Sequence, residues 1–416
     1  MSKYVIRGGE RLCGDIKIKG AKNSVLTLLA ACVLADGVSV LHDCPHITDV
    51  DTMLEILKKL GCKIVRNGDD VTVDSRDVSC GKIPCELASE LRSSVFILGP
   101  LLSRLKKAKV AYPGGCDIGL RPIDIHLAGL RELGVKITEK HGYINCDSSF
   151  AKSNDIILDL PSVGATENLV MTCVFLDGVS IIRNCAKEPE IVDLQNFLNA
   201  MGAKVSGAGT GVIKVEGVKK LHGTEYTPIP DRIVAGTYLI GVAMCGGELT
   251  LTNVNPEHLS SLLAKLPKSS CKITCARDKI NMICNGRCES VPKVETTYYP
   301  GFPTDLQTQI LTLQTVSEGT SVIVENIFET RFKTVPQLLK MGADVTVNCR
   351  TAVVRGVERL TGAEVSATDL RGGASLVLAG MCAQGETVVD NIGHIDRGYE
   401  DLSLILPEVG VKIKRV

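Results

Sequence analysis

The sequence lacks the features that mark several large classes of protein. Its 416 residues carry 47 lysines and arginines against 47 aspartates and glutamates, and no long segment has charge of one sign. A nucleic-acid surface usually needs an excess of positive charge, so we do not expect one here. The longest apolar stretches, 24–34 and 169–176, are too short to span a bilayer. No Walker or Rossmann glycine pattern occurs in its required context, which argues against those nucleotide-binding folds.

The chain also lacks a recognisable secretion signal. Its first residues, MSKYVIRGGERL, are charged and alternate like a strand, so we expect no signal peptide. A chain that is not secreted keeps its cysteines reduced. We therefore expect the 17 cysteines to be thiols, mostly buried as small apolar residues. The apolar fraction of 44% is that of a folded protein, and the length suits two large domains. These features predict a soluble, cytoplasmic protein.

A phrase that recurs six times organises the chain. Each copy has a helix, usually ending in Leu-x-x-x-Gly, then an alternating strand, a short turn and a second strand, as in LEILKKLGCKIVRNGDDVTVD. The glycine is typical of a C′ stop after a helix. Another helix and strand precede each copy, so each repeat is predicted as helix, strand, helix, strand, strand. The fourth copy departs, because Pro267 and Ser270 stand where the others end the helix cleanly.

The sixth copy ends at Val416, one strand short, and the N-terminus supplies a matching strand. KYVIRGGERLCG matches VIKVEGVKKLHG and TAVVRGVERLTG almost position for position. We therefore predict an α/β fold with two three-repeat domains, one at 21–228 and the other formed by 1–20 plus 229–416. The chain would cross between them twice, near 20–22 and 228–232. Such a double hinge suits opening and closing around a ligand.

Two loops carry residues that a repeat scaffold does not need. The first, YPGGCDIGLRPIDIH at 112–126, surrounds Cys116 with three glycines. We expect this cysteine to be exposed, and Arg121 nearby can stabilise its thiolate. On chemistry alone, an incidental loop thiol is an equal alternative. The second loop, NIGHIDRGYE at 391–400, carries Arg397.

Further charged residues stand at the starts of predicted elements. Lys22, Asn23 and Ser24 begin an apolar helix that Asn23 or Ser24 can cap, and the free amides with Lys22 make an anion site. The simpler alternative is an ordinary cap with a solvated lysine. Asp305 is likewise explained by a plain N-cap. The other candidates, each of which alone is more simply explained by a surface or structural ion pair, are Arg92, Arg232, Arg331, Arg371 and Arg397.

Four cysteines, Cys271, Cys275, Cys284 and Cys288, flank one predicted hairpin. Zinc sites prefer Cys-x-x-Cys knuckles, whereas three residues separate the members of each pair here. Packing of the strands is therefore the better interpretation. We expect neither a metal nor a cofactor.

Taken in order, the motifs resemble those of the UDP-N-acetylglucosamine 1-carboxyvinyltransferase family. They are GAKNS, PGGCDIGLRPIDIH, PSVGATEN, EPEIVD, PDRI, FPTDLQ, FETRF, ATDLR and HIDRGYE, and the similarity runs from Val5 to Val416. The resemblance implies two inside-out α/β barrels, each of three repeats with the helices inside. It also implies the first committed step of peptidoglycan precursor synthesis, in which phosphoenolpyruvate adds to the sugar 3′-hydroxyl and phosphate leaves. Only small-molecule partners are expected, with no nucleic acid, membrane or obligatory oligomer.

The resemblance further implies residue roles. Cys116 matches the acid that protonates the enol, which can form a covalent phospholactoyl adduct and is alkylated by fosfomycin. Asp305 matches the proposed base. The matching positions for phosphoenolpyruvate are Lys22, Asn23, Arg121, Arg371 and Arg397. Those for the nucleotide sugar are Asn23, Arg92, Arg121, Pro122, Ile123, Asp124, Ile125, Ser162, Val163, Gly164, Asp305, Ile327 and Arg331.

Two departures and two alternatives remain. Leu160-Pro161 stands where relatives have Lys-Val, so one contact to the uridine diphosphate is in doubt, and Pro407 should kink or shorten the last helix. The sister family that acts on shikimate phosphate shares the fold but lacks the glycine-cysteine loop. A non-catalytic paralogue on the same scaffold would be expected to lose its charged residues first, yet Lys22, Asp305 and the arginines are all present.

Overall fold

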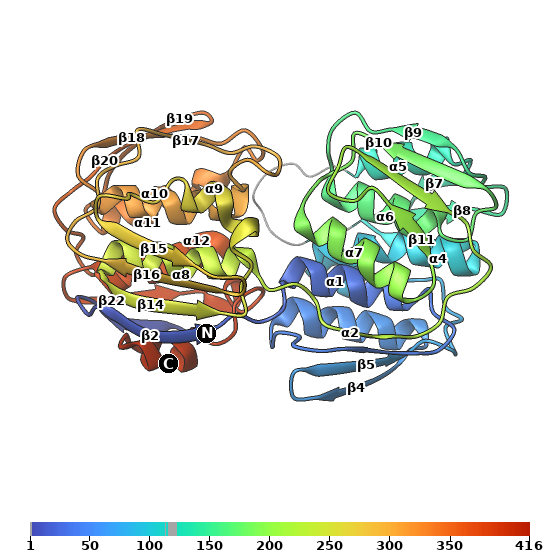
Figure 1. Cartoon of the computed structure of the whole chain (residues 1–416), viewed down its shortest axis with the longest axis horizontal. Helices are drawn as coiled ribbons and strands as arrows, with labels where there is room; N and C mark the ends of the chain where they lie inside the picture. The colour runs from blue at the N-terminus through green and yellow to red at the C-terminus, as the bar shows by residue number, and fades with distance from the viewer. Residues whose placement is uncertain (1, 113, 115–122) are drawn as a thin grey trace. The chain divides into compact units, whose positions relative to one another are not determined.

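The computed structural model describes residues 2–112, 114 and 123–416, which form two compact units (Figure 1). The N-terminal unit contains residues 20–112, 114 and 123–229. The C-terminal unit contains residues 2–19 together with 230–416. The first residues of the chain therefore pack with its second half.

The N-terminal unit alternates helices and strands along the chain. Its helices are α1 (Lys22–Cys32), α2 (Thr48–Leu60), α3 (Cys85–Glu90), α4 (Leu98–Leu105), α5 (Asp124–Glu132), α6 (Val163–Cys173) and α7 (Pro189–Ala200). Its strands are β3 (Val38–Leu41), β4 (Lys63–Asn67), β5 (Asp70–Asp74), β6 (Lys107–Ala111), β7 (Lys136–Lys140), β8 (Tyr143–Asp147), β9 (Asp155–Ile157), β10 (Val179–Arg183), β11 (Lys204–Ser206), β12 (Val212–Glu216) and β13 (Glu225–Tyr226).

The C-terminal unit is built in the same way. Its helices are α8 (Arg232–Cys245), α9 (Ser260–Leu263), α10 (Gln307–Val316), α11 (Val335–Lys340), α12 (Leu370–Cys382) and α13 (Leu402–Ile405). Its strands are β1 (Tyr4–Arg7), β2 (Leu12–Lys17), β14 (Gly247–Thr252), β15 (Cys271–Cys275), β16 (Lys279–Cys284), β17 (Lys293–Glu295), β18 (Thr320–Val324), β19 (Asp344–Asn348), β20 (Thr351–Arg355), β21 (Glu364–Ser366), β22 (Glu386–Asp390) and β23 (Lys412–Arg415).

The strands of the described residues form six small mixed sheets, three in each unit. Their orders are β13-β3-β5-β4, β6-β8-β7 and β11-β12-β10-β9 in the N-terminal unit, and β15-β16-β14-β2, β17-β18-β20-β19 and β21-β22-β1-β23 in the C-terminal unit. In each four-stranded sheet one edge strand pairs in parallel and the other two pairings are antiparallel. The three-stranded sheet has the same parallel edge reduced to one bridge, Lys82 to Lys109. This recurring pattern confirms the sixfold repeat.

The N-terminal strand completes the sixth repeat, as the sequence match predicted. Tyr4 of β1 pairs with Val389 of β22 on one side and with Arg415 of β23 on the other. Tyr4 and Ile6 are fully buried, because their alternation points both side chains into the core of the C-terminal unit. The strand that begins the chain is thus an interior strand of a sheet made otherwise from the last 55 residues or so of the sequence.

The predicted helix stops are also confirmed. Gly61, Gly134, Gly202, Gly342 and Gly410 follow the second helices of five repeats, and all have φ between 85° and 106°. That left-handed conformation ends a helix at little cost only where no Cβ is present. Pro407 shortens the last helix as expected: α13 covers four residues and continues as a 3-10 turn, Leu406–Val409.

Three helices of the C-terminal unit, α8, α10 and α12, pack against one another and are buried on nearly all faces (Figure 1). A helix that is apolar all round is expected to be buried, and α8 and α12 fit that description. Helix α10 instead carries three threonines. Thr312 and Thr315 donate to the carbonyls of Thr308 and Thr312 at 2.8 and 2.7 Å, and Thr308 donates to the Gln307 side chain at 3.3 Å. Its hydroxyls therefore need no water.

The expectation that every cysteine is a thiol is wrong for one pair. A disulfide joins Cys271 to Cys284, and the Sγ atom of Cys288 lies 3.7 Å from each of them. The antiparallel register sets Cys271 directly opposite Cys284, which the spacing in the sequence could not reveal. These three cysteines are buried with their sulfur atoms within 4.8 Å of one another, whereas Cys275 is exposed, so the packing interpretation is wrong for Cys275. The other exposed thiols of the described residues are Cys13, Cys80, Cys85 and Cys349.

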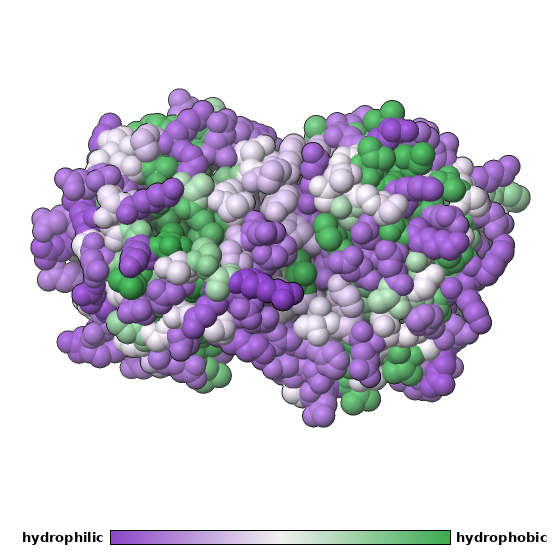
Figure 2. Space-filling model, viewed as in Figure 1, coloured by the Kyte–Doolittle hydropathy of each residue, from purple (hydrophilic) through white to green (hydrophobic). Residues whose placement is uncertain are grey.

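No helix in the described part of the chain is long and apolar enough to cross a membrane. The face drawn in Figure 2 is mostly hydrophilic, with small apolar areas scattered over it.

Candidate functional site

A cluster of buried charge lies at the start of three elements of the C-terminal unit. Asp305 belongs to the 3-10 turn Thr304–Leu306 before α10, Arg331 opens the turn Arg331–Thr334 before α11, and Arg371 is the second residue of α12. Arg331 Nη2 lies 2.5 Å from Asp305 Oδ1, and Arg371 Nη2 lies 3.6 Å from Asp305 Oδ2. Arg331 Nη1 is also 3.8 Å from Asp369 Oδ1. The sequence-predicted residues Asp305, Arg331 and Arg371 therefore meet in one place.

Burial separates this cluster from ordinary surface ion pairs. Arg331 and Arg371 are only 2% and 3% exposed, and Asp369 is 1% exposed, whereas the Asp305 side chain keeps 28% of its surface. Arg331 and Arg371 are therefore not surface ion pairs, but both do form ion pairs inside the fold, as the structural half of that alternative states. The N-cap alternative is wrong for Asp305, because its turn is preceded by Pro303 and has no side-chain cap. The residue in this cluster that caps a helix is Asp369, whose Oδ1 accepts from the amides of Arg371 and Gly372, each at 3.0 Å.

Arg371 is poised to bind an anion. Among the described residues its Nη1 has no hydrogen-bond partner, although the side chain is almost fully buried. Burial acts to lower the pKa of Arg371, but Tyr399, Asp305 and Asp231 raise it, with a net rise above the ordinary value. The guanidinium thus stays charged while one of its donors is unmet. A buried donor without an acceptor is costly, so a carboxylate or phosphate oxygen would be well placed there.

A second buried acid supports the cluster and was missed by the sequence analysis. Glu325 is fully buried, and its Oε2 accepts from the hydroxyl of Thr304, the neighbour of Asp305, at 3.0 Å. Its Oε1 accepts from the amides of Ile327 and Phe328 at 2.8 and 3.0 Å. Glu325 therefore fixes both the turn that carries Asp305 and the loop that carries Ile327. No sequence signal distinguishes it, because it simply follows the alternating strand β18.

In the N-terminal unit, Lys22 forms an ion pair that the sequence did not suggest. Its Nζ lies 2.5 Å from Asp49 Oδ2, and both residues are buried. The expected cap is wrong: Ala21 is the N-cap, without a side-chain bond, and Asn23 and Ser24 already lie inside α1. Their side chains take no part in capping, because the helix starts from an extended Ala21. Lys22 stands at the helix N-terminus with its charge partly offset by Asp49.

Two hydroxyls of α1 contact buried carboxyl groups. Ser24 donates to Asp193, which also accepts from the Tyr226 hydroxyl at 2.6 Å. The Thr27 hydroxyl lies 2.9 Å from Glu167 Oε1, and no partner is recorded within the described residues for Glu167 Oε2. Burial raises the pKa of Glu167 well above its ordinary value; the hydrogen bond with Thr27 lowers it, and the nearby Glu190 and Glu188 raise it. The folded state therefore keeps the proton of Glu167 to higher pH than an ordinary carboxyl group would.

Six of the positions predicted for the nucleotide sugar lie at the N-termini of two packed helices. Ile123 precedes α5 and Asp124 and Ile125 begin it, while Ser162 caps α6 by accepting from the Ala165 amide at 3.3 Å. Val163 and Gly164 begin α6. A Cβ at Gly164 would lie 2.9 Å from the His126 ring and 2.8 Å from Phe96, so glycine is required there. The Asn168 amide and the His126 ring, 2.9 Å apart, tie α6 to α5.

Several predicted residues lie elsewhere or outside the described part of the chain. Arg92 begins the 3-10 turn Arg92–Ile97 and is half-buried. Arg232 follows the cap Asp231 on α8 and lies over the Tyr299 ring at 5.6 Å. Arg397 is half-buried beyond the turn Ile392–His394. Cys116, Arg121 and Pro122 are outside the described residues, so their predicted roles stay predictions.

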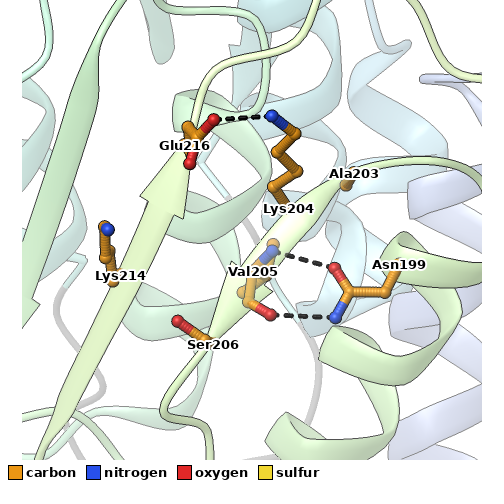
Figure 3. A pocket seen from close by; sticks show the side chains of 7 residues that line it. All are labelled: Asn199, Ala203, Lys204, Val205, Ser206, Lys214 and Glu216. Carbon is orange, nitrogen blue, oxygen red and sulfur yellow. Dashed lines mark hydrogen bonds and ion pairs between the residues drawn. The ribbon is translucent and has the colours of Figure 1, made fainter.

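Two surface hollows in the N-terminal unit are poorly suited to bind an anion. One, of about 270 Å³, lies against β11 and β12 (Figure 3). There the Asn199 side chain makes two 2.8 Å hydrogen bonds with the backbone of Val205, and Lys204 forms an ion pair with Glu216 at 2.6 Å. These groups are already satisfied by one another. The other, of about 370 Å³, borders Ile125 but is lined by Glu132, Asp155 and Asp159, which disfavour an anion.

Comparison with known proteins agrees with the motifs. The model of the EPSP synthase (3-phosphoshikimate 1-carboxyvinyltransferase) family matches residues 6–406. The chain is 54% identical to UDP-N-acetylglucosamine 1-carboxyvinyltransferase 2 of Caldanaerobacter subterraneus subsp. tengcongensis, and it is 46% identical to the UDP-N-acetylglucosamine 1-carboxyvinyltransferase of Xylella fastidiosa. Both matches cover the whole of each chain.

Solved structures show the same fold. The enolpyruvyl transferase NikO from Streptomyces tendae matches with a TM-score of 0.89 at 24% identity, over 100% of this chain and 99% of that one. EPSP synthase from Acinetobacter baumannii matches with a TM-score of 0.75 at 18% identity, over all of both chains. The α/β fold, the ordered motifs and the full-length similarity lead to one conclusion: the chain belongs to the enolpyruvyl transferase family.

Proposed function

We propose that this chain transfers the enolpyruvyl group of phosphoenolpyruvate to the 3′-hydroxyl of UDP-N-acetylglucosamine and releases phosphate, the first committed step of peptidoglycan precursor synthesis. Relatives of 46% and 54% identity over their full length carry that name. The observation that carries the proposal is the buried cluster of Asp305, Arg331 and Arg371, in which Arg371 retains an unmet donor. A phosphorylated carboxylic acid needs such fixed cations.

The chemistry requires an acid and a base together. The sugar 3′-oxygen bonds to C2 of phosphoenolpyruvate while a proton is added to C3, giving a phosphate-bearing tetrahedral adduct. Loss of that C3 proton with departure of phosphate restores the double bond on the new ether. Cys116 is the proposed acid and can also hold a phospholactoyl thio-adduct. Asp305 is the proposed base, and Arg331 and Arg371 stabilise its negative charge.

Phosphoenolpyruvate is proposed to bind Lys22, Asn23, Arg121, Arg371 and Arg397. The sugar nucleotide is proposed to bind at the starts of α5 and α6 together with Asn23, Arg92, Arg121, Pro122, Asp305, Ile327 and Arg331. The absence of lysine at Leu160-Pro161 removes one cation from the nucleotide side, and the exposed Leu160 offers no replacement charge.

The two units are proposed to be the two domains of 21–228 and 1–20 plus 229–416, each an inside-out α/β barrel. The almost complete burial of α8, α10 and α12 supports the inward placement of helices. Because the proposed acid and base belong to different domains, the domains should close on UDP-N-acetylglucosamine and exclude water. Small-angle scattering tests this closure, and an unchanged radius of gyration at saturating ligand would contradict it.

Phosphate release tests the function. Wild-type protein should release phosphate from phosphoenolpyruvate only when UDP-N-acetylglucosamine is also present. Shikimate 3-phosphate in its place should give none. Phosphate release with shikimate 3-phosphate but not with UDP-N-acetylglucosamine would favour the sister activity. No release with either acceptor would favour a non-catalytic paralogue.

A further inference from the structure

Tyr399 has no role in the proposed mechanism, yet it contacts Arg371, a proposed ligand of phosphoenolpyruvate. This tyrosine lies between β22 and α13, is 2% exposed, and its ring centroid is 5.4 Å from the guanidinium carbon of Arg371. A guanidinium over an aromatic face is attracted by the ring quadrupole, most strongly where water is excluded. The aromatic ring is therefore a direct physical restraint on the position of Arg371.

Other restraints on the Arg371 head group are weak. Asp305 lies 3.6 Å from Nη2, beyond ordinary hydrogen-bond distance, and Nη1 has no partner among the described residues. Asp369 holds the backbone amide of Arg371 and therefore fixes the helix start rather than the guanidinium. A long side chain with few hydrogen bonds keeps much of its rotamer freedom unless packing removes it.

The hydroxyl of Tyr399 is itself tied down. It lies 2.8 Å from Thr237 Oγ1 on α8 and accepts from Gln309 Nε2 on α10 at 3.3 Å. Thr237 donates its own hydrogen to the Ile233 carbonyl at 2.8 Å, so the proton between the two hydroxyls comes from Tyr399. The chain of contacts thus runs from α8 and α10 through the tyrosine to Arg371 on α12, the three central helices of the C-terminal unit (Figure 1).

We propose that Tyr399 is a positioning residue for Arg371: its ring holds the guanidinium with the free Nη1 available to the phosphoenolpyruvate anion, and its hydroxyl fixes the ring. The inference rests on the proposed function. It predicts a specific loss of affinity for phosphoenolpyruvate, because the nucleotide sugar is assigned to other residues. Thr237 and Gln309 act indirectly, because they hydrogen-bond to the Tyr399 hydroxyl and so hold its ring in place.

The test compares two tyrosines that resemble each other. Tyr4 is also fully buried, bonds Asp401 through its hydroxyl at 3.1 Å and lies under Arg415 at 5.9 Å, but it is part of the interior strand β1. Tyr399→Leu should raise the KM for phosphoenolpyruvate by up to about thirtyfold, the fold-change that corresponds to losing a desolvated cation–π contact. The KM for UDP-N-acetylglucosamine should stay within about twofold. Tyr4→Leu should lower the melting temperature but leave both KM values unchanged.

Tyr399→Phe keeps the ring and removes the hydroxyl, so its KM for phosphoenolpyruvate should lie between those of wild type and Tyr399→Leu. Equal changes in both KM values for Tyr399→Leu, or the same pattern in Tyr4→Leu, would show a merely structural role and overturn the proposal. If wild-type protein releases no phosphate, the proposed function fails. The positioning role is then judged by the rise in melting temperature that phosphoenolpyruvate causes: it should be smaller in Tyr399→Leu than in Tyr4→Leu, and equal rises overturn it.

Discussion

Glu167 offers a sharp test of the buried carboxyl network beside α1. The side chain is fully buried, lies 2.9 Å from the Thr27 hydroxyl through Oε1, and has no recorded partner at Oε2 within the described residues. Thr27 also donates to the Asn23 carbonyl at 3.0 Å. A neutral Glu167 with its proton on Oε1 donates to Thr27 and leaves the Thr27 hydrogen for Asn23. A glutamine amide can make the same donation, so Glu167→Gln mimics the neutral acid.

The sign of the pH dependence follows from the raised pKa. Burial raises the pKa of Glu167 in the folded state, while the unfolded chain ionises near pH 4.3. Between these two values the folded state binds one more proton, so wild-type stability is present at low pH and is lost as pH rises. The slope for a full proton is about 1.4 kcal/mol per pH unit. Glu167→Gln has no proton to lose, so this slope vanishes.

Denaturant unfolding at several pH values measures the difference. From pH 5 to pH 7 the stability of Glu167→Gln should rise relative to wild type by up to about 2.7 kcal/mol, with other titrating groups cancelling between the two proteins. The exposed Glu225 on β13 provides the control, because Glu225→Gln should follow wild type. A constant gap between Glu167→Gln and wild type across this range would refute the raised pKa of Glu167.

The remaining predictions concern the proposed site and the cysteines. Arg397→Ala should keep its circular dichroism spectrum but lose about 1.5 to 3 kcal/mol of transition-state stabilisation, since a substrate anion then lacks a charge-assisted hydrogen bond; nearly full turnover would make Arg397 structural. In denaturant without reductant, the protein should show 15 titratable thiols, the 17 cysteines less the Cys271–Cys284 pair, and 17 after reduction; 17 in both conditions would contradict the disulfide. Fosfomycin should leave one adduct, on Cys116, which peptide mass spectrometry can map against the exposed Cys13 or Cys349. Cys116→Asp should remain active and resist the compound, and an adduct on another cysteine or a drug-sensitive Cys116→Asp enzyme would defeat the assignment.

Much of the fold could be predicted because its signals are local or internal to the chain. The glycines after the repeat helices need only a left-handed backbone, which Gly61 and Gly410 adopt. The placement of β1 followed from comparing the first residues with two later copies. The register that sets Cys271 opposite Cys284 could not be predicted. It depends on the turn between β15 and β16, in the fourth repeat, which differs from the other five.

The site was predicted only as a set of residue types. The order of the motifs singled out Lys22, Asp305, Arg331 and Arg371. Burial in the folded chain is what separates a site residue from an ordinary cap or surface ion pair. A surface ion pair and a buried charged cluster cannot be told apart from the sequence. The partners Asp49, Glu325 and Tyr399 were missed because an acid near a helix start, the end of a strand and a loop aromatic are all common in any protein. Their importance comes from distances that only the folded chain defines.

The most direct test of the account is the identity of the product. Phosphoenolpyruvate labelled with carbon-13 at C3 should be incubated with UDP-N-acetylglucosamine and the wild-type protein, and the products followed by nuclear magnetic resonance and mass spectrometry. The account predicts one carboxyvinyl group per nucleotide sugar, bonded through the 3′-oxygen, with one phosphate released for each group transferred. A labelled group on another hydroxyl, or phosphate release that leaves UDP-N-acetylglucosamine unmodified, would contradict it.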